Sequence, residues 1–280
     1  MQKTTPDEMK TIAKYVKDVS GIHLDQSKAY LIETRLGPVA EEVGCSSYAE
    51  LHQKAILDAT KSIKEKIIEA ISTNETQFFR DSRPFELLQH KILPELIDMR
   101  SAKSSSLLPT SIRIWSAACS TGQEVYSIAI VLKELLSDLK KYNIKLLGTD
   151  ISDAAVARAS YGAYNKFEIE RGLARDKLEK YFTPNGNTWK IKDDMRAMAN
   201  FKKLNLMLPF AALGKFDVIF CRNVGIYFGL EDRKKFFDRI ADMLDSGGSL
   251  IIGSTESLTG ISKRFEPKRH LRSIFYQVKE

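Results

Sequence analysis

The sequence predicts an α/β fold in which a mainly parallel, Rossmann-like sheet follows a small all-helical N-terminal domain. From residue 112 onward, short apolar runs alternate with stretches of helical periodicity, which is typical of a parallel sheet with helices on both faces. Before residue 73, apolar residues recur at helical spacing instead. We therefore expect an all-helical domain at 1–72 and an α/β domain at 73–280.

Capping signals indicate four short helices in the first domain. Thr5-Pro6-Asp7-Glu8 forms a capping box with proline at the first helical position, and Gly21 ends that helix. A second helix either breaks at Gly37-Pro38 or continues through it with a kink. Ser47 and Glu50 form a second capping box, and a fourth helix follows. Four such helices indicate a small bundle.

The second domain is expected to begin with a helix at 83–99 and a serine-rich loop at 100–111. Its last segment, RFEPKRHLRSIFYQVKE, is expected to form two paired strands with no helix between them, which differs from the usual dinucleotide-binding pattern. The other expected strands are 112–118, 143–150, 216–223 and 249–255, and the expected helices are 122–136, 151–162 and 230–247.

The alternation is interrupted between Tyr161 and Met207, where Asn185-Gly186 is a strong hairpin-turn signal. We expect an inserted β-subdomain at about 163–200. This part is basic, because residues 156–203 hold 11 Lys/Arg and 6 Asp/Glu out of a chain whose net charge is +7. A basic surface attracts nucleic acid, acidic membranes or acidic proteins, but on charge alone a solvated face is the simpler interpretation.

Several classes of protein are excluded by what the sequence lacks. No run of about eighteen apolar residues is present, so no membrane span is expected. The N-terminus has no apolar segment of the kind found in signal peptides. Cys45, Cys119 and Cys221 are odd in number and irregularly spaced, which favours neither a disulfide framework nor a zinc site. We expect a cytoplasmic protein without a bound metal.

Two motifs lie where an open α/β sheet binds its ligands, at the carboxyl ends of strands. The first is SAACSTGQE, at 116–124, whose small residues let the backbone approach a ligand closely. The second is Asp150, which ends the next strand, where an acidic residue commonly accepts hydrogen bonds from ribose hydroxyls. Together they favour a cofactor that contains a nucleoside, although neither G-x-G-x-x-G nor a phosphate-binding loop is present. A third motif, CRNVGIYF at 221–228, contains Tyr227, which alone would more simply be a core residue with a satisfied hydroxyl.

These motifs resemble those of the chemotaxis receptor methyltransferases, the CheR family. ISTNETQFFRD, IWSAACSTGQEVYSIAI, LLGTDIS and FDVIFCRNVGIYF occur in the family's order and spacing, and the resemblance covers nearly the whole chain. Gly225 departs from the pattern, because a larger apolar residue is expected there, and this should affect packing more than chemistry. The resemblance implies a class I S-adenosylmethionine-dependent methyltransferase fold that ends in an antiparallel hairpin.

The resemblance also implies a reaction and partners. Such enzymes transfer a methyl group from S-adenosylmethionine to glutamate side chains of chemoreceptors for chemotactic adaptation, giving methyl esters and S-adenosylhomocysteine. The partner is the helical cytoplasmic domain of the receptors, without nucleic acid or membrane insertion. In some members the inserted subdomain docks a receptor tail peptide. The hairpin here is shorter than expected for those members, which favours a tail-independent enzyme.

The resemblance assigns roles to particular residues. Arg80 would orient the substrate carboxylate, and Tyr227 would lie beside the transferred methyl group. Glu124 would meet the ammonium group of the cofactor. Phe78 and Phe79 are more simply core residues. The cofactor-binding residues carried over are Asn74, Thr76, Arg80, Glu124, Asp150, Asn205, Leu206, Arg222 and Asn223.

Two rival functions remain open from the residues alone. The basic insert slightly favours a methyltransferase of nucleic acid or protein amines, but such enzymes usually need proton handling or an Asn/Asp-Pro-Pro-aromatic loop, and here the strand ends in CRNVGIYF. A non-catalytic sensor that keeps only the cofactor pocket is the second rival. The presence of both Arg80 and Tyr227 argues against it.

Overall fold

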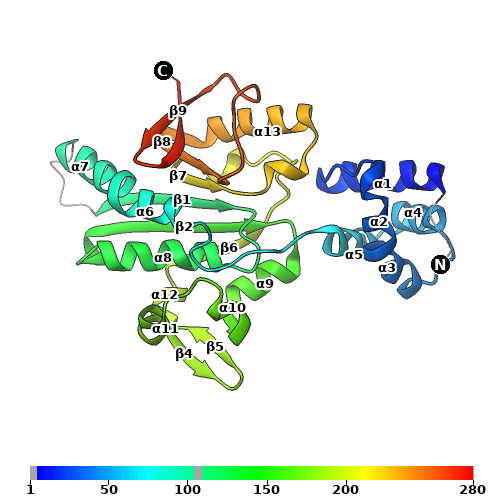
Figure 1. Ribbon diagram of the computed structural model, residues 1–280, viewed down its shortest axis with the longest axis horizontal. Helices are drawn as coiled ribbons and strands as arrows, with labels where there is room; N and C mark the ends of the chain where they lie inside the picture. Colours follow the sequence, from blue (N-terminus) through cyan, green and yellow to red (C-terminus); the bar gives the residue numbers. More distant parts are fainter. Residues whose placement is uncertain (1–4, 104–108, 280) are drawn as a thin grey trace.

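The computed structural model describes residues 5–103 and 109–279 and has two parts (Figure 1). Five short helices form one end of the molecule, and a seven-stranded sheet covered by helices forms the other. A separate three-stranded sheet lies below the large sheet in this view. This arrangement confirms the predicted fold class. None of the helices in the described ranges is long and apolar enough to cross a membrane.

The capping signals set the ends of the N-terminal helices. Thr5 and Glu8 form both hydrogen bonds of the capping box, and Gly21 adopts the left-handed conformation at φ 80°. The second box is displaced by one residue, because Ser47 caps the helix while the Glu50 carboxylate accepts from the backbone of Ser46. The helices are α1 (Pro6–Ser20), α2 (Ala29–Leu31), α3 (Gly37–Glu42), α4 (Tyr48–Leu57) and α5 (Ser62–Ile71).

The second predicted helix continues through Gly37-Pro38. A π-helical turn at Ile32–Leu36 joins α2 to α3. Proline has no N–H to donate, and a local widening of the helix accommodates that loss without ending the helix. The core of this domain lies between the helices and is formed by buried residues such as Ile12, Val16, Ile32, Leu36, Leu51 and Ile67.

The helix that opens the α/β domain is longer than predicted. It comprises α6 (Arg83–Leu87), a π-helical turn (Leu88–Ile92) and α7 (Leu93–Lys103). Residues 100–103 of the predicted serine-rich loop are therefore helical, and its last two residues begin β1 at Thr110. Residues 104–108 of that loop lie outside the described part of the chain.

The large sheet has the order β6-β2-β1-β7-β8-β10-β9. Pairing is parallel from β6 to β8, and the predicted C-terminal hairpin adds β10 and β9 in antiparallel pairing. The carboxyl ends of β1 and β2 point toward the helical domain (Figure 1). The strands are β1 (Thr110–Ala117), β2 (Tyr142–Asp150), β6 (Ala199–Lys203), β7 (Phe216–Cys221), β8 (Leu244–Ile252), β9 (Phe265–His270) and β10 (Ser273–Val278).

Helices α8 (Gln123–Leu135) and α9 (Asp153–Tyr161) agree with the predicted helices within a few residues. The prediction of a helix to Gly247 was wrong, because α13 (Leu230–Met243) ends four residues earlier. Leu244 is already extended, at φ −80° and ψ 139°, and it pairs with Phe216 across the sheet. Pairing to a buried strand thus overrides the local helical pattern of the sequence.

The inserted sheet has the order β3-β5-β4. Asn185 pairs with Thr188, so the two loop residues of the predicted hairpin are Gly186 and Asn187 rather than Asn185 and Gly186. Gly186 takes the positive φ of 58° that such a loop requires. The elements are β3 (Ala163–Asn165), α10 (Lys166–Glu170), α11 (Arg175–Tyr181), β4 (Phe182–Asn185), β5 (Thr188–Ile191) and α12 (Asp193–Arg196).

Gly225 is explained by an aromatic ring on α13. A Cβ atom at this position would lie 3.0 Å from Cε2 of Phe237 and 3.2 Å from Oε1 of Glu256. Phe237 is buried, so its ring occupies the space that a larger apolar residue at 225 would need. The departure from the family pattern is therefore a matter of packing between the 225–227 turn and α13.

We predict that Gly225→Leu lowers the free energy of unfolding by about 1–3 kcal/mol, because it overpacks the contact with Phe237. Gly229→Leu is the matched control, since a Cβ there meets its nearest atom only at 3.7 Å. Urea denaturation measures both. Equal destabilisation by the two changes would contradict this explanation of Gly225.

Candidate functional site

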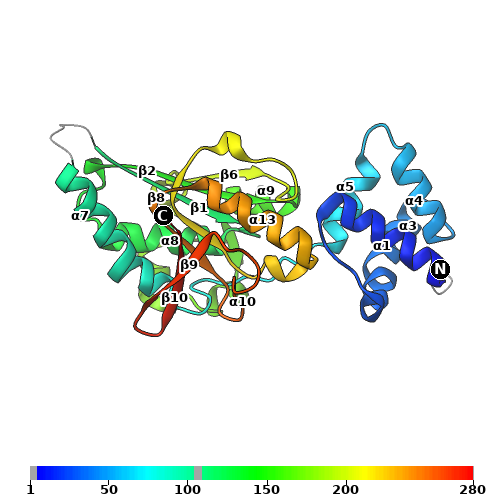
Figure 2. The same cartoon turned by 90° about the horizontal axis from the view of Figure 1, so that it is seen from above.

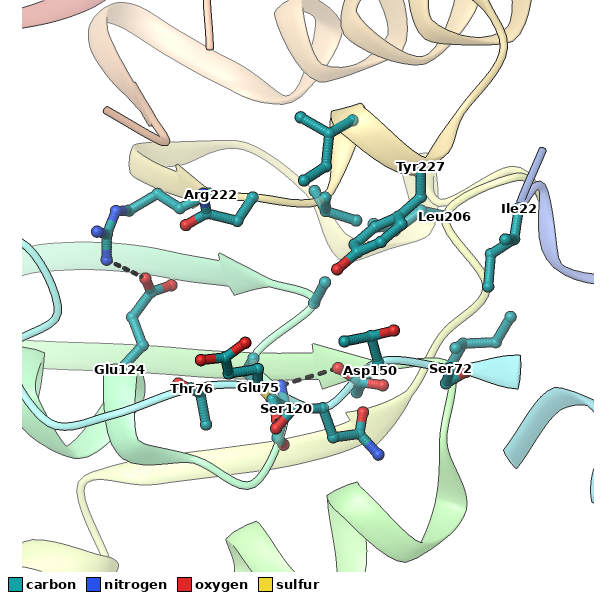
Figure 3. A pocket seen from close by; sticks show the side chains of 18 of the residues that line it. Ile22, Ser72, Glu75, Thr76, Ser120, Glu124, Asp150, Leu206, Arg222 and Tyr227 are labelled. Carbon is teal, nitrogen blue, oxygen red and sulfur yellow. Dashed lines mark hydrogen bonds and ion pairs between the residues drawn. The ribbon is translucent and has the colours of Figure 1, made fainter. Parts of the chain in front are cut away.

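All ten residues assigned from the sequence line one cavity (Figure 3). It measures about 1160 Å³, including the open space at its mouth. The carboxyl ends of β1, β2 and β7 form one side, and residues 72–77 cross the other. Ser20 and Ile22 of the helical domain complete the wall. The cavity is large enough for a nucleoside-containing cofactor.

The turn after β1 brings backbone into the cavity. Ala118 and Ser120 have positive φ angles of 59° and 51°, and Gly122 has 94°. A Cβ at Gly122 would lie 2.9 Å from Cβ of Ala159 on α9, so glycine permits this close packing. The small residues of the motif therefore shape a tight turn at the end of the strand, as the sequence predicted.

Asp150 lies beneath this turn. Its Oδ2 accepts from the Ser120 N–H at 2.8 Å, and Oδ1 accepts from the Ser152 N–H at 3.0 Å. Burial raises the pKa of Asp150, and these backbone donors oppose that effect only in part. Each carboxylate oxygen keeps a further lone pair, so Asp150 is able to accept from two ribose hydroxyls.

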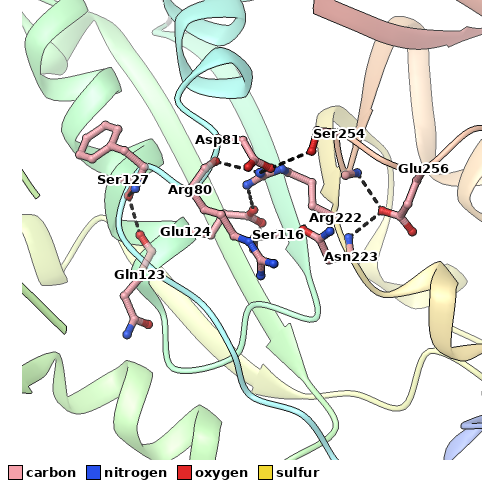
Figure 4. Close-up of polar contacts among 12 residues, drawn as sticks. Arg80, Asp81, Ser116, Gln123, Glu124, Ser127, Arg222, Asn223, Ser254 and Glu256 are labelled. Atoms are coloured by element: carbon pink, nitrogen blue, oxygen red, sulfur yellow. Dashed lines mark hydrogen bonds and ion pairs between the residues drawn. The ribbon is translucent and has the colours of Figure 1, made fainter. Parts of the chain in front are cut away.

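A buried ion-pair network forms the other end of the cavity (Figure 4). The Arg222 side chain is only 2% exposed and donates to Oε2 of Glu124 at 2.9 Å and to Oδ2 of Asp81 at 2.8 Å. Glu124 also accepts from the Ser116 hydroxyl at 2.8 Å. Two carboxylates thus meet one guanidinium, which leaves a net negative charge beside the cavity. Such a site suits the ammonium group of an amino acid.

Arg222 also fixes the segment that contains Arg80. Its Nη2 donates to the carbonyl of Arg80 at 2.8 Å, and Asp81 accepts in addition from the Ser254 hydroxyl. Arg222 is therefore a positioning residue, because its donors are used within the protein; Nε alone is buried without a partner among the described residues. Its assignment as a direct cofactor contact is the least supported of the ten.

Residues 72–77 have no regular secondary structure and residues 78–80 form a turn, and contacts with other parts of the chain hold this segment in place. Phe78 is fully buried in the core, as predicted, and the Phe79 N–H donates to the Ser127 hydroxyl of α8. The Asn74 carbonyl accepts from the Ser120 hydroxyl. The guanidinium of Arg80 donates through Nη1 to the carbonyl of Glu75 at 3.0 Å. Its other donors have no partner among the described residues, and Arg80 lines the cavity.

Tyr227 is not an ordinary core residue. It is half-buried, and Figure 3 shows its hydroxyl pointing into the cavity. The hydroxyl has no hydrogen-bond partner among the described residues, so the alternative of a satisfied core tyrosine does not hold. The carbonyl of Tyr227 accepts from the N–H of His23, and Ile22 forms an isolated bridge with Phe228. The helical domain therefore contacts the backbone that carries this side chain.

Asn205 and Leu206 line the same cavity, but the Asn205 side chain already serves the protein. Its Nδ2 donates to the carbonyl of Val19 at the end of α1, and its Oδ1 accepts from the N–H of Met207. Leu206 is buried. Asn205 thus links the two parts of the molecule at the cavity wall.

Sequence reasoning missed three residues that shape the site. Asp81 ends the motif TNETQFFRD, and Ser116 begins the motif SAACSTGQE. The need of a buried Arg222 for two acceptors would have indicated Asp81. Glu256 accepts from the N–H groups of Asn223 and Gly253 at 2.7 and 2.8 Å, holding the ends of β7 and β8 together. It lies 33 residues from Asn223, and no local pattern marks it.

Cys119 and Cys221 are buried, and burial raises the pKa of both thiols well above its usual value. A buried thiol whose pKa is raised in this way is a poor nucleophile. No group of three or more His, Cys, Asp or Glu able to hold a metal occurs in residues 5–103 and 109–279.

Comparison with known proteins identifies the family. Residues 74–273 match the family "CheR methyltransferase, SAM binding domain", and residues 7–71 match "CheR methyltransferase, all-alpha domain". The chain belongs to the CheR methyltransferase family. It is 36% identical to chemotaxis protein methyltransferase Cher2 of Pseudomonas putida over 95% of each chain. It is 35% identical to a chemotaxis protein methyltransferase of Vibrio parahaemolyticus over 97% of each chain.

The protein is thus an S-adenosylmethionine-dependent methyltransferase, and specifically a protein-glutamate O-methyltransferase. The cavity fits that cofactor. It offers a buried carboxylate beneath the turn that follows β1 and an acidic cluster at its other end. The unpartnered Tyr227 hydroxyl and the Arg80 donors remain available at the cavity wall.

We predict that Arg222→Met lowers the free energy of unfolding of the methyltransferase by about 3–5 kcal/mol, because it leaves Glu124 buried without its cation. Asp81→Asn is the control. Its side chain is 37% exposed, so we expect a loss below about 1 kcal/mol. Urea denaturation measures stability, and calorimetric titration with S-adenosylhomocysteine should show weaker binding by Arg222→Met. A stability equal to that of the wild type would contradict the role of the network.

We also predict that the affinity of the methyltransferase for S-adenosylhomocysteine decreases as the pH is lowered. Ribose hydroxyls donate to the ionised form of Asp150, so binding is strongest above the folded-state pKa and weakens as pH falls through it. Because burial raises this pKa above 3.8, the loss begins at a higher pH than for an ordinary aspartate. Titrations from pH 7 to 4 measure it, with Asp150→Asn as the control that should bind weakly with a flatter pH dependence. Identical pH profiles would contradict the assignment.

Proposed function

We propose that this enzyme methylates glutamate side chains in the helical cytoplasmic domain of chemoreceptors, with Arg80 orienting the carboxylate and Tyr227 placing it against the transferred group. One observation carries the proposal: free donors of Arg80 and the free hydroxyl of Tyr227 line the same cavity as Asp150 and Glu124. The cofactor supplies an electrophilic methyl group on a positively charged sulfur.

The chain's own residues need not remove a proton. A glutamate carboxylate has a reference pKa of about 4.3, so it is already ionised at neutral pH. No histidine lines the cavity, which fits a reaction without a general base. The remaining requirement is placement of one oxygen in line with the methyl group, and orientation of this kind is an effective source of catalysis.

Arg80 meets that requirement by holding the carboxylate without covering the attacking oxygen. Its guanidinium is tied at one nitrogen to the carbonyl of Glu75, which limits its movement. The remaining donors are able to bind the second carboxylate oxygen through charge-assisted hydrogen bonds. The Tyr227 hydroxyl donates one further hydrogen bond to the substrate carboxylate, close to the methyl group that is transferred. The hydrogen bond from the His23 N–H to the Tyr227 carbonyl holds the backbone of this tyrosine in position.

Further parts of the proposal concern the partner and the domains. The β4 and β5 strands are four residues each, a short hairpin that favours docking without a receptor tail peptide. We place the enzyme in the cytoplasm, where the helical part of a receptor lies. We also propose residues 1–72 and 73–280 as its domains, supported by the separate family matches at 7–71 and 74–273.

The test is methyl transfer from labelled S-adenosylmethionine to receptor-containing membranes, followed by mild base. We predict volatile labelled methanol, which marks a carboxyl ester. Arg80→Ala should lose transfer by about a hundredfold or more, because the carboxylate is no longer oriented. S-adenosylhomocysteine binding should largely survive in this variant, since the other cavity residues remain.

The matched control is Arg83→Ala, an exposed arginine three residues further along the chain. It should leave kcat unchanged. Label that resists base would indicate nitrogen methylation and overturn the proposed reaction. Full activity of Arg80→Ala would overturn the role of Arg80 alone.

A further inference from the structure

The C-terminal hairpin carries a concentration of positive charge that the site does not use. Residues 263–279 contain six Lys/Arg and one Asp/Glu, a net charge of +5 in a chain whose total is +7. The strands are β9 and β10, and the turn between them contains Leu271 and Arg272. A local excess of this kind attracts anionic partners where its charges are not paired within the protein.

Most of these cations at the turn are unpaired. Lys268 binds Glu266, the acidic residue of the segment. The side chains of Arg269, His270 and Arg272 have no hydrogen bond or ion pair with any described residue. An isolated surface cation is ordinary, but two arginines without acceptors at one short turn form a surface that attracts an anionic partner.

Apolar side chains accompany the charges. Leu271 at the turn is 84% exposed and Ile274 is 48% exposed. The backbone of Leu271 has a positive φ of 52°, so a large apolar residue occupies a position that glycine or asparagine would fill more easily. The turn therefore combines two exposed apolar side chains, Leu271 and Ile274, with unpaired arginines. This combination is typical of protein-binding surfaces.

The hairpin joins the large sheet beside β8, the strand that leads into the network at the cavity. Tyr276 of β10 pairs with Leu250, near the carboxyl end of β8, in antiparallel register. Ser254, two residues beyond β8, bonds Asp81 in the network at the cavity. Helix α6 begins at exposed Arg83 and packs against β10. Figure 2 shows the hairpin projecting from the body of the sheet.

We propose that the β9–β10 turn, formed by Arg269, His270, Leu271 and Arg272, is a docking surface for an acidic stretch of the receptor helices. This inference rests on the proposed function, because a receptor segment that presents glutamates for methylation is itself anionic. The unpaired arginines would contact carboxylates flanking the target residue, while Leu271 packs against apolar positions of the same helix.

Two cations at the second helix of the helical domain are less available for this purpose. Arg35 donates to the carbonyls of Ile71 and Ser72 and to the Thr73 hydroxyl. Lys28 lies 3.8 Å from Asp25. These two cations of the second helix are therefore engaged within the protein, whereas the hairpin cations are not.

The test compares two double charge reversals in the full-length enzyme. Arg269→Glu/Arg272→Glu changes the proposed surface. Lys141→Glu/Lys145→Glu makes the same change in net charge at two exposed lysines. One lies just before β2 and the other in its first half, at the amino end of that strand. Methyl transfer is measured against the concentration of a soluble receptor cytoplasmic fragment, at low and high salt. Fragment binding is measured separately by fluorescence anisotropy.

For the hairpin variant we expect KM for the receptor fragment to rise about tenfold, with kcat and S-adenosylhomocysteine affinity unchanged. The wild-type KM should rise with salt and the variant KM should rise less. The lysine variant should behave as the wild type. Leu271→Gly, which suits the positive φ, should also raise KM.

Unchanged KM in the hairpin variant, or an equal effect of the lysine variant, would overturn the proposal. Binding to anionic lipid vesicles that the hairpin variant loses, with unchanged KM for the fragment, would assign the surface to a membrane instead. A wild-type enzyme that binds the fragment but forms no ester would contradict the proposed reaction, and anisotropy of the variants would still decide the docking surface.

Discussion

The buried guanidinium of Arg222 is the contact on which the site depends. It joins Glu124 at the start of α8, Asp81 after the 72–80 segment, and the end of β7, three parts of the chain separated by up to 142 residues. A charge buried to this degree is tolerated only when its partners are in place. The network therefore fixes the position of the Arg80 backbone before any ligand binds.

The second constraint is that the cavity wall comes from both domains. Near the end of α1, the Val19 carbonyl accepts from the Asn205 side chain, and the His23 N–H donates to the Tyr227 carbonyl. Glu69 of α5 accepts from the hydroxyl of Ser152 and from the N–H of Ala154, at the start of α9. Lys203 adds ion pairs to Glu65 and Asp153 across the same boundary. The helical domain is thus part of the site, and movement of that domain would displace Tyr227.

The sequence was informative where local chemistry decides the structure. The Thr5 capping box, the small-residue turn at 116–122 and Asp150 each follow from short patterns, and the structure places them as expected. It was uninformative where distant partners decide. The end of α13 was mispredicted because Leu244 pairs with a distant strand. Glu256 was missed because its two donors, Asn223 and Gly253, follow two different strands. The sequence of residues 1–72 carries no local signal that Ile22 lines the cavity.

The electrostatics of the site agree with a reaction that consumes two opposite charges. An acidic cluster and the carboxylate of Asp150 favour a cationic ligand, while Arg80 favours an anionic one. When a carboxylate attacks a methyl group on positively charged sulfur, the ester and the thioether formed are both neutral. In the reaction that we propose, the cavity holds its two reactants by interactions that weaken as products form, which helps their release. A general base would add nothing to this reaction, because the attacking carboxylate is already ionised, and no histidine lines the cavity.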